Sequence, residues 1–130
     1  MTYKQHSDAD FKVFVHHIYE YQKGLRNLVL HTMSATAKEE VVGYLLRKKI
    51  AFHINEVSKN RINVFFGDVR CVNIVKSFNF SSLTHLTDEQ DFILGIMLGY
   101  DQRLQCERFL KRKSMFTVRQ QDESIHKICV

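Results

Sequence analysis

Histidines near the N-terminus are the residues best suited to chemistry in this chain of 130 residues. His16 and His17 precede Glu20 by four and three residues, a spacing that brings all three side chains close together on a helix. Imidazole and carboxylate groups can hold a divalent metal if His31 or His53 supplies a third ligand. A single His-x-x-Glu pattern also suits surface histidines with local hydrogen bonds. We therefore predict no bound metal or cofactor, and keep His16, His17 and Glu20 as the candidate ligands.

Motifs that catalyse bond formation are missing from the sequence. There is no Gly-x-Ser-x-Gly elbow, no Gly-rich phosphate loop and no Cys-x-x-Cys pair. Three acids, Asp88, Glu89 and Asp91, lie close together, but they open an apolar run, where acids favour a helix N-terminus. The sequence therefore favours a binding protein over an enzyme.

A predicted β-hairpin has one face that could bind a ligand. Residues 50–57 and 61–66 alternate in polarity around the turn residues 58–60, so one face of the hairpin is apolar. The opposite face would carry His53, Asn55, Arg61, Asn63 and Phe65. A ring, a guanidinium and amides could stack a nucleic-acid base and bond its edges. The competing interpretation is that the N-terminal helix or the C-terminal tail covers this face.

The longest basic run lies in the last predicted helix. Six cations and one acid, Glu107, fall between residues 103 and 119, a balance of +5 that equals the formal net charge of the chain. The six are Arg103, Arg108, Lys111, Arg112, Lys113 and Arg119. Such a field could attract phosphates or an acidic protein. The alternative is a solvated helix end whose cations interact favourably with the helix dipole.

Two shorter basic runs are assigned to helix ends. Lys23 and Arg26 flank Gly24, whose turn amides could bind an anion, although a plain helix stop is the preferred interpretation. Residues 47–49, Arg-Lys-Lys, close another predicted helix, where cations suit the dipole.

The spacing of apolar residues predicts the elements that position these groups. Helices are expected over residues 11–23, 36–49, 69–78, 87–98 and 101–113. Strands are expected over residues 26–33, 50–57 and 61–66. Thr36 and Thr87 are the predicted N-caps of their helices, with Glu39 and Gln90 at the capping-box positions. If Leu28 and Leu30 point inward, Asn27, Val29 and His31 would join the polar hairpin face.

The order of these elements favours an α+β fold. Strand, helix, strand, strand, helix is the order of a ferredoxin-like sheet, and a further strand over 79–84 would complete its split βαβ pattern. The small antiparallel sheet would have helices on one face, together with an N-terminal helix and a C-terminal helical pair. The length suits one domain, with an arm over 1–10, a core over 11–113 and a tail over 114–130.

Two segments resemble a known family. The first, His16 to Thr32, reads His-His-Ile-Tyr-Glu-Tyr-Gln-Lys-Gly-Leu-Arg-Asn-Leu-Val-Leu-His-Thr. The second runs from Leu86 to Asp101 and on to Leu110. They resemble a small bacterial family, the domain of unknown function 2023, over about residues 11–110. The resemblance implies a compact α+β fold and genes near flavodoxin; it implies no activity, cofactor or catalytic residue.

The chain shows no signal-peptide pattern, and its longest strongly apolar stretch, residues 92–100, is too short to span a bilayer. We therefore expect a cytoplasmic protein without a membrane partner; a homo-oligomer is left open.

The leading functional hypothesis is a non-enzymatic accessory module. It would bind an acidic protein, with a flavodoxin-like protein as one candidate, through the basic helix and the hairpin face. The alternative is a nucleic-acid-binding module that uses the same cations with Arg61 and Phe65. The third is a His-dependent metal or cofactor protein.

Overall fold

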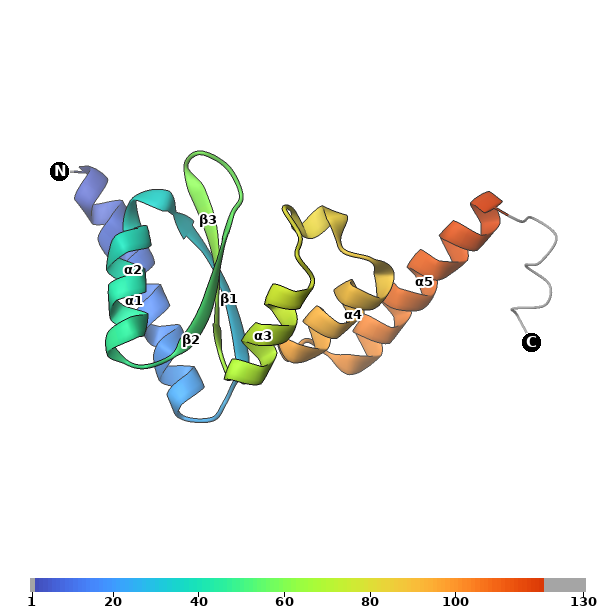
Figure 1. Ribbon diagram of the computed structural model, residues 1–130, viewed down its shortest axis with the longest axis horizontal. Coiled ribbons are helices and arrows are strands. Elements are labelled where there is room, and N and C mark those ends of the chain that lie inside the picture. Colours follow the sequence, from blue (N-terminus) through green and yellow to red (C-terminus); the bar gives the residue numbers. More distant parts are fainter. Residues whose placement is uncertain (1, 121–130) are drawn as a thin grey trace. The chain divides into compact units, whose positions relative to one another are not determined.

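The computed structural model describes the backbone of residues 2–120 and the side chains of residues 9–114. The chain divides into two compact units, residues 1–85 and residues 86–130 (Figure 1). The first unit contains the sheet, and the second contains the C-terminal helical pair. The predicted α+β class, N-terminal helix and C-terminal helical pair are confirmed. The single-domain organisation stays a prediction, and residues 121–130 of the predicted tail lie outside the described residues.

The first unit is built on three antiparallel strands in the order β1-β3-β2. Its elements are α1 (Thr2–Gln22), β1 (Leu28–Ser34), the 3-10 turn η1 (Ala35–Ala37), α2 (Lys38–Arg47), β2 (Ala51–Glu56), β3 (Arg61–Gly67), α3 (Val69–Ser77) and the 3-10 turn η2 (Leu83–His85). No strand forms over 79–84, and the described residues therefore contain three strands, where a split βαβ fold has four. The ferredoxin-like assignment is not confirmed.

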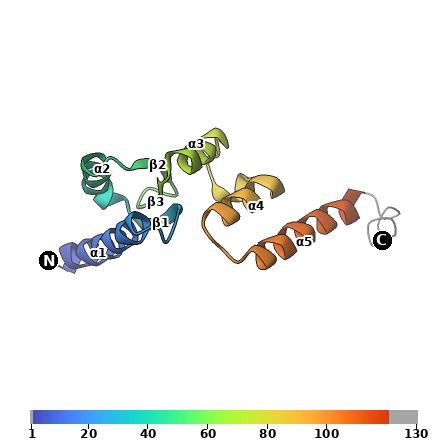
Figure 2. The same ribbon diagram turned by 90° about the horizontal axis from the view of Figure 1, so that it is seen from below.

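Helices α1 and α2 cover one face of this sheet (Figures 1 and 2). Val29 of β1 and Phe52 of β2 both lie opposite Phe66 of β3, so the three side chains share this face. Phe14 of α1 packs against them, with its ring centroid 5.4 Å from that of Phe66. Phe14 is fully buried, and each such ring contributes about 2–3 kcal/mol through the apolar area that it removes from water. The core of the first unit lies between these helices and the sheet.

The opposite face of the sheet is also covered. Helix α3 packs against β2 and β3, which the expectation of helices on one face did not include. Leu28 and Phe65, on this second face, are fully buried. Leu30 lies opposite Phe65, so the prediction that Val29 and His31 join the polar face is wrong. Both faces of β1 are covered, and its apolar run therefore did not reveal which residues point to which face.

Local capping explains where the helices begin. Asp68 accepts a hydrogen bond from the N–H of Arg70 at the start of α3. Thr87 and Gln90 form the predicted capping box at the start of α4 (Asp88–Met97). The prediction for Thr36 is wrong, because Ser34 accepts its N–H and caps η1 instead, and α2 then starts at Lys38. The one-turn insertion shortens the predicted helix at its beginning.

The second unit is an antiparallel helical hairpin of α4 and α5 (Gln102–Gln120). The rings of Phe92 and Phe109 pack edge to face, with centroids 5.5 Å apart. Gly95 lies against the side chain of Gln105, and a Cβ atom at this position would push the amide end of that side chain aside. Within the described part of the chain, no helix is long and apolar enough to cross a bilayer.

Helix α2 ends with an unusual residue in a left-handed conformation. The N–H of Lys49 bonds to the carbonyl of Leu46, and the N–H of Ile50 bonds to that of Leu45, which is a Schellman motif. Lys49 has φ of 58°, at the position where helices usually place glycine. A side chain at this position costs stability, since its Cβ atom approaches the following carbonyl.

We predict that Lys49→Gly raises the free energy of unfolding by about 1 kcal/mol, because glycine adopts this backbone without a Cβ penalty. Lys49→Ala is the matched control, since it removes the same charge and keeps the Cβ atom. Chemical denaturation of the two variants and the wild type checks this. A Lys49→Gly chain no more stable than Lys49→Ala would contradict it.

A candidate partner-binding surface

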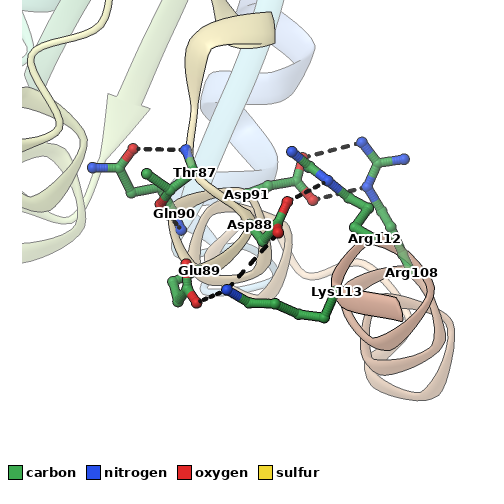
Figure 3. Close-up of polar contacts among 8 residues, drawn as sticks. All are labelled: Thr87, Asp88, Glu89, Gln90, Asp91, Arg108, Arg112 and Lys113. Atoms are coloured by element: carbon green, nitrogen blue, oxygen red, sulfur yellow. Dashed lines mark hydrogen bonds and ion pairs between the residues drawn. The ribbon is translucent and has the colours of Figure 1, made fainter. Parts of the chain in front are cut away.

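The cations of α5 are largely paired within their own hairpin. Arg108 donates to both carboxylate oxygens of Asp91, at 2.8 and 3.1 Å (Figure 3). Arg112 contacts Asp88 at 2.8 Å and Asp91 at 3.0 Å, measured from guanidinium nitrogen to carboxylate oxygen. Lys113 contacts Asp88 and Glu89 through its ammonium group. Three of the five predicted partner-binding cations of this helix therefore already face acids.

The antiparallel hairpin creates this pairing. The three acids occupy the first turn of α4, where the dipole favours them, and the hairpin brings the later turns of α5 alongside. The hydrogen bond from Arg108 lowers the pKa of Asp91, and that from Lys113 lowers the pKa of Glu89. Residues 86–113 hold five cations and five carboxylates, so this part of the hairpin has no net charge.

Two predicted cations of α5 stay exposed. Arg103 and Lys111 form no ion pair with any side chain in the described range 9–114. Arg119, which completes the basic run in the sequence, lies beyond the described side chains. The role of this helix in partner binding stays a prediction, but its charge excess is largely balanced by α4.

The hairpin face predicted as a ligand surface is closed by the protein itself. Phe65 is fully buried, and its ring centroid lies 6.0 Å from that of Phe80 and 6.3 Å from that of His53. Burial, with the nearby charge of Lys76, lowers the pKa of His53. Helix α3 and the following loop cover this face, whereas the N-terminal helix α1 packs on the opposite one. The expectation of an open stacking surface at Phe65 is wrong, while Arg61 is exposed at the start of β3.

The amides on this face are satisfied internally. Thr32 donates to Asn63 at 2.6 Å, and Asn63 donates to Asn55 at 3.4 Å. Asn55 in turn donates to the carbonyl of Ser81 at 3.2 Å. Both asparagines are buried, so these bonds offset the cost of removing their amides from water. The polar row anchors the loop after α3, and its amides are not presented to a ligand.

Of the candidate metal ligands, all but His53 lie close together. Glu20 lies 3.7 Å from Nε2 of His16 and 3.3 Å from Nδ1 of His17. The ring of His31 lies 5.3 Å from that of His17, whereas His53 is on the opposite face of the sheet. Burial, with the neighbouring His17, lowers the pKa of His31. Nε2 of His31 is buried and has no hydrogen-bond partner among the described residues.

This arrangement does not form a metal-ligand set. Nδ1 of His17 also lies 3.3 Å from a guanidinium nitrogen of Arg26, which places a positive charge beside the nitrogen that a metal would use. No group of three or more His, Cys, Asp or Glu side chains that could hold a metal occurs in the described residues.

Strand register brings three basic segments together at one end of the sheet in the first unit. Leu28, the first residue of β1, and Ala51, the first of β2, both lie opposite Gly67, the last residue of β3. The segments before β1 and β2 and the segment after β3 consequently meet at one end of the sheet, the lower end of this unit in Figure 1. We call residues 23–27, 46–50 and 68–70 the basic end.

The basic end holds the entire charge excess of the protein. It contains six cations and one acid, a balance of +5 that equals the formal net charge of the chain, while the remaining cations and acids are equal in number. The six are Lys23, Arg26, Arg47, Lys48, Lys49 and Arg70. Hydrogen bonds from the side chain and N–H of Arg70 hold the pKa of Asp68 at about 2, so this acid stays ionised and paired.

Exposed apolar side chains lie among these cations. Leu25, Leu46 and Val69 are 70%, 62% and 56% exposed, and each belongs to a different segment of the basic end. Two of the cations form cation–π contacts with a neighbouring ring. Arg47 and Lys48 lie 5.9 and 5.7 Å from the ring centroid of Tyr44. Cations around exposed aliphatic groups are typical of a protein-binding surface with a polar rim.

This surface was not predicted from the sequence, because the basic runs that form it were assigned separately to helix ends. The available signal was that two basic runs, 23–26 and 47–49, each immediately precede a predicted strand. Only the antiparallel pairing of β1 and β2 with β3 makes those positions neighbours.

The ion pair between α4 and α5 can be measured with a double-mutant cycle. We predict a coupling energy of about 1 kcal/mol between Asp91→Asn and Arg108→Gln, the value for a half-exposed bidentate pair. Asp91→Asn combined with Arg103→Gln is the control and should give coupling near zero. Urea denaturation followed by helical circular dichroism gives both values, and equal coupling in the two cycles would argue against the pairing.

We also predict that acid weakens the α4–α5 hairpin. The pKa values of Asp91 and Glu89 are lowered below their ordinary 3.8 and 4.5, so these acids stabilise the fold above those values and lose this effect as pH falls through the lowered values. The melting temperature should therefore drop between about pH 5 and pH 3. Asp91→Asn should show a smaller drop over the same interval, and an unchanged drop would contradict the assignment.

Comparison with known proteins identifies a family. The family described as protein of unknown function (DUF2023) matches residues 12–112, almost the range over which the two sequence segments resemble it. A search of curated proteins finds no match. Because the family match spans most of the 130 residues, the chain belongs to this family of proteins of unknown function.

Proposed function

We propose that this protein is a non-enzymatic binding module for an acidic protein partner, and that the basic end is its contact surface. The observation that carries the proposal is the location of the whole charge excess at one end of the sheet, around three exposed apolar side chains. The positive field would accelerate the encounter with an acidic protein, and the apolar groups would supply affinity after contact.

The pairing in the second unit favours the basic end over α5 as the main surface. A partner that used Arg108, Arg112 or Lys113 would compete with acids that these side chains already contact. Arg103 and Lys111 could supplement the contact, but they are two charges against five at the basic end once Arg70, which binds Asp68, is set aside. An acidic flavodoxin-like protein is the first partner that we would test.

The apolar groups favour a protein over a nucleic acid. Leu25, Leu46 and Val69 are aliphatic and cannot stack a base, and the Tyr44 ring is engaged by cations of its own helix. Phe65, the ring that the hairpin offered for stacking, is buried, and the exposed ring of Tyr19 already has the ammonium of Lys23 5.3 Å from its centroid.

We predict that Arg47→Glu with Lys48→Glu abolishes partner capture, whereas Arg103→Glu with Lys111→Glu leaves it within about twofold. The reversed pair repels an acidic surface, which costs at least tenfold in affinity. The tagged full chain would serve as bait in extract of its source organism, with bound proteins identified by mass spectrometry and circular dichroism confirming that each variant folds.

Capture of the same acidic protein by Arg47→Glu with Lys48→Glu would contradict the choice of surface. An RNA or DNA ligand whose affinity falls steeply with salt would replace the proposal with the nucleic-acid alternative, because phosphate contacts release counterions.

A further inference from the structure

A pair of histidines lies between α1 and the sheet. His17 of α1 and His31 of β1 face each other where this helix packs along the strand, with ring centroids 5.3 Å apart. The ring of Phe14, which is fully buried, lies 6.5 Å from that of His31. The two imidazoles therefore border the core at the place where α1 is held on the sheet.

His31 is accommodated as a neutral ring. Its Nε2 atom is buried and has no hydrogen-bond partner among the described residues. A buried polar atom without a partner lowers stability, and the cost grows if the group becomes charged. Both ring nitrogens of an imidazolium are donors, so a proton on Nε2 would have no acceptor to bond.

The charged groups that face His31 do not favour its protonation. Burial is the largest influence and lowers the pKa of His31 below its ordinary 6.5. From α1, His17 lowers this pKa further, whereas Asp10 raises it; from β3, Arg61 lowers it. The one acid near the ring therefore does not offset burial and the neighbouring basic groups.

His17 is also held in its neutral form by one of its contacts. A guanidinium nitrogen of Arg26 lies 3.3 Å from its Nδ1, and because a guanidinium only donates, this nitrogen accepts the bond while it carries no proton. The carboxylate of Glu20 lies 3.3 Å from the same nitrogen and 3.7 Å from Nε2 of His16. One carboxylate thus already faces two imidazoles, which limits its capacity to compensate a new charge at His31.

We propose that His17 and His31 form a pH-sensitive switch, which holds α1 on the sheet while both rings are neutral and releases the helix when they take up protons. Protonation would leave a buried donor unpaired at His31 and would displace Arg26 from Nδ1 of His17. Because α1 leads directly into residues 23–27, release of the helix would also move one of the three segments of the basic end. The switch does not depend on the identity of any partner.

The direction of the pH effect follows from His31. Its pKa is lowered only while α1 is docked, so as pH falls below 6.5 the released chain takes up a proton at this ring before the docked chain does. Docking is therefore at full strength above pH 6.5 and weakens as pH falls toward the lowered pKa.

Hydrogen exchange of the full chain at about pH 7.5 and about pH 5.5, corrected for the intrinsic effect of pH on exchange, measures this release. We expect the protection of the α1 amides to fall at least about tenfold at the lower pH, the effect of one pKa unit. His31→Phe keeps a ring beside Phe14 and cannot take up a proton, so it should remove the fall. His53→Phe is the matched control and should keep it, since burial also lowers the pKa of His53 but this residue lies on the opposite face of the sheet.

Equal protection of α1 at the two pH values overturns the switch, and so does a fall of the same size in His31→Phe. Circular dichroism shows whether this variant folds. If it does not fold, NMR titration of the His31 ring in the wild-type chain decides instead. A midpoint below pH 6.5 that coincides with the midpoint of the loss of α1 protection supports the switch, and any other midpoint overturns it.

Discussion

The pairing of β3 with both of its neighbours is the constraint on which the rest of the first unit depends. Because β3 is central and both of its faces are covered, α1 and α2 must pack on one side and α3 on the other. Its last residue, Gly67, lies opposite the first residues of both edge strands. That register sets which chain ends meet, and so it places the basic end. A shift of one residue would move every side chain of a strand to the other face.

The two units differ in how far their cations are neutralised by nearby acids, and counting charged residues along the sequence does not show this difference. Cations outnumber acids within α5, yet the hairpin brings the acids of α4 into contact with those cations. The basic end has six cations and one acid, and that acid is bound by Arg70. Charges within an antiparallel hairpin neutralise one another at short range, whereas like charges gathered from separate segments add to a field that extends about a Debye length into solvent.

Much of the local structure could be predicted. The hairpin around residues 58–60 and the Thr87–Gln90 capping box follow rules that act over a few residues, and both are confirmed. Other predictions about the helices and strands failed. Ser34 took the capping role assigned to Thr36, residues 79–84 formed no strand, and β1 presented the opposite face, because its apolar run fits both orientations. Family membership was visible in two segments and is confirmed.

The sequence by itself determined the α+β class, most helix and strand positions, the absence of familiar catalytic motifs and the total charge. These depend on composition and on contacts between residues near in the chain. Only the tertiary structure decided which cations are paired, which face of the hairpin is covered and where the net charge lies. Asp91 and Arg108 are separated by a helix and a turn, and the three segments of the basic end are separated by whole elements. Their proximity comes from helix packing and strand register, which no local pattern encodes.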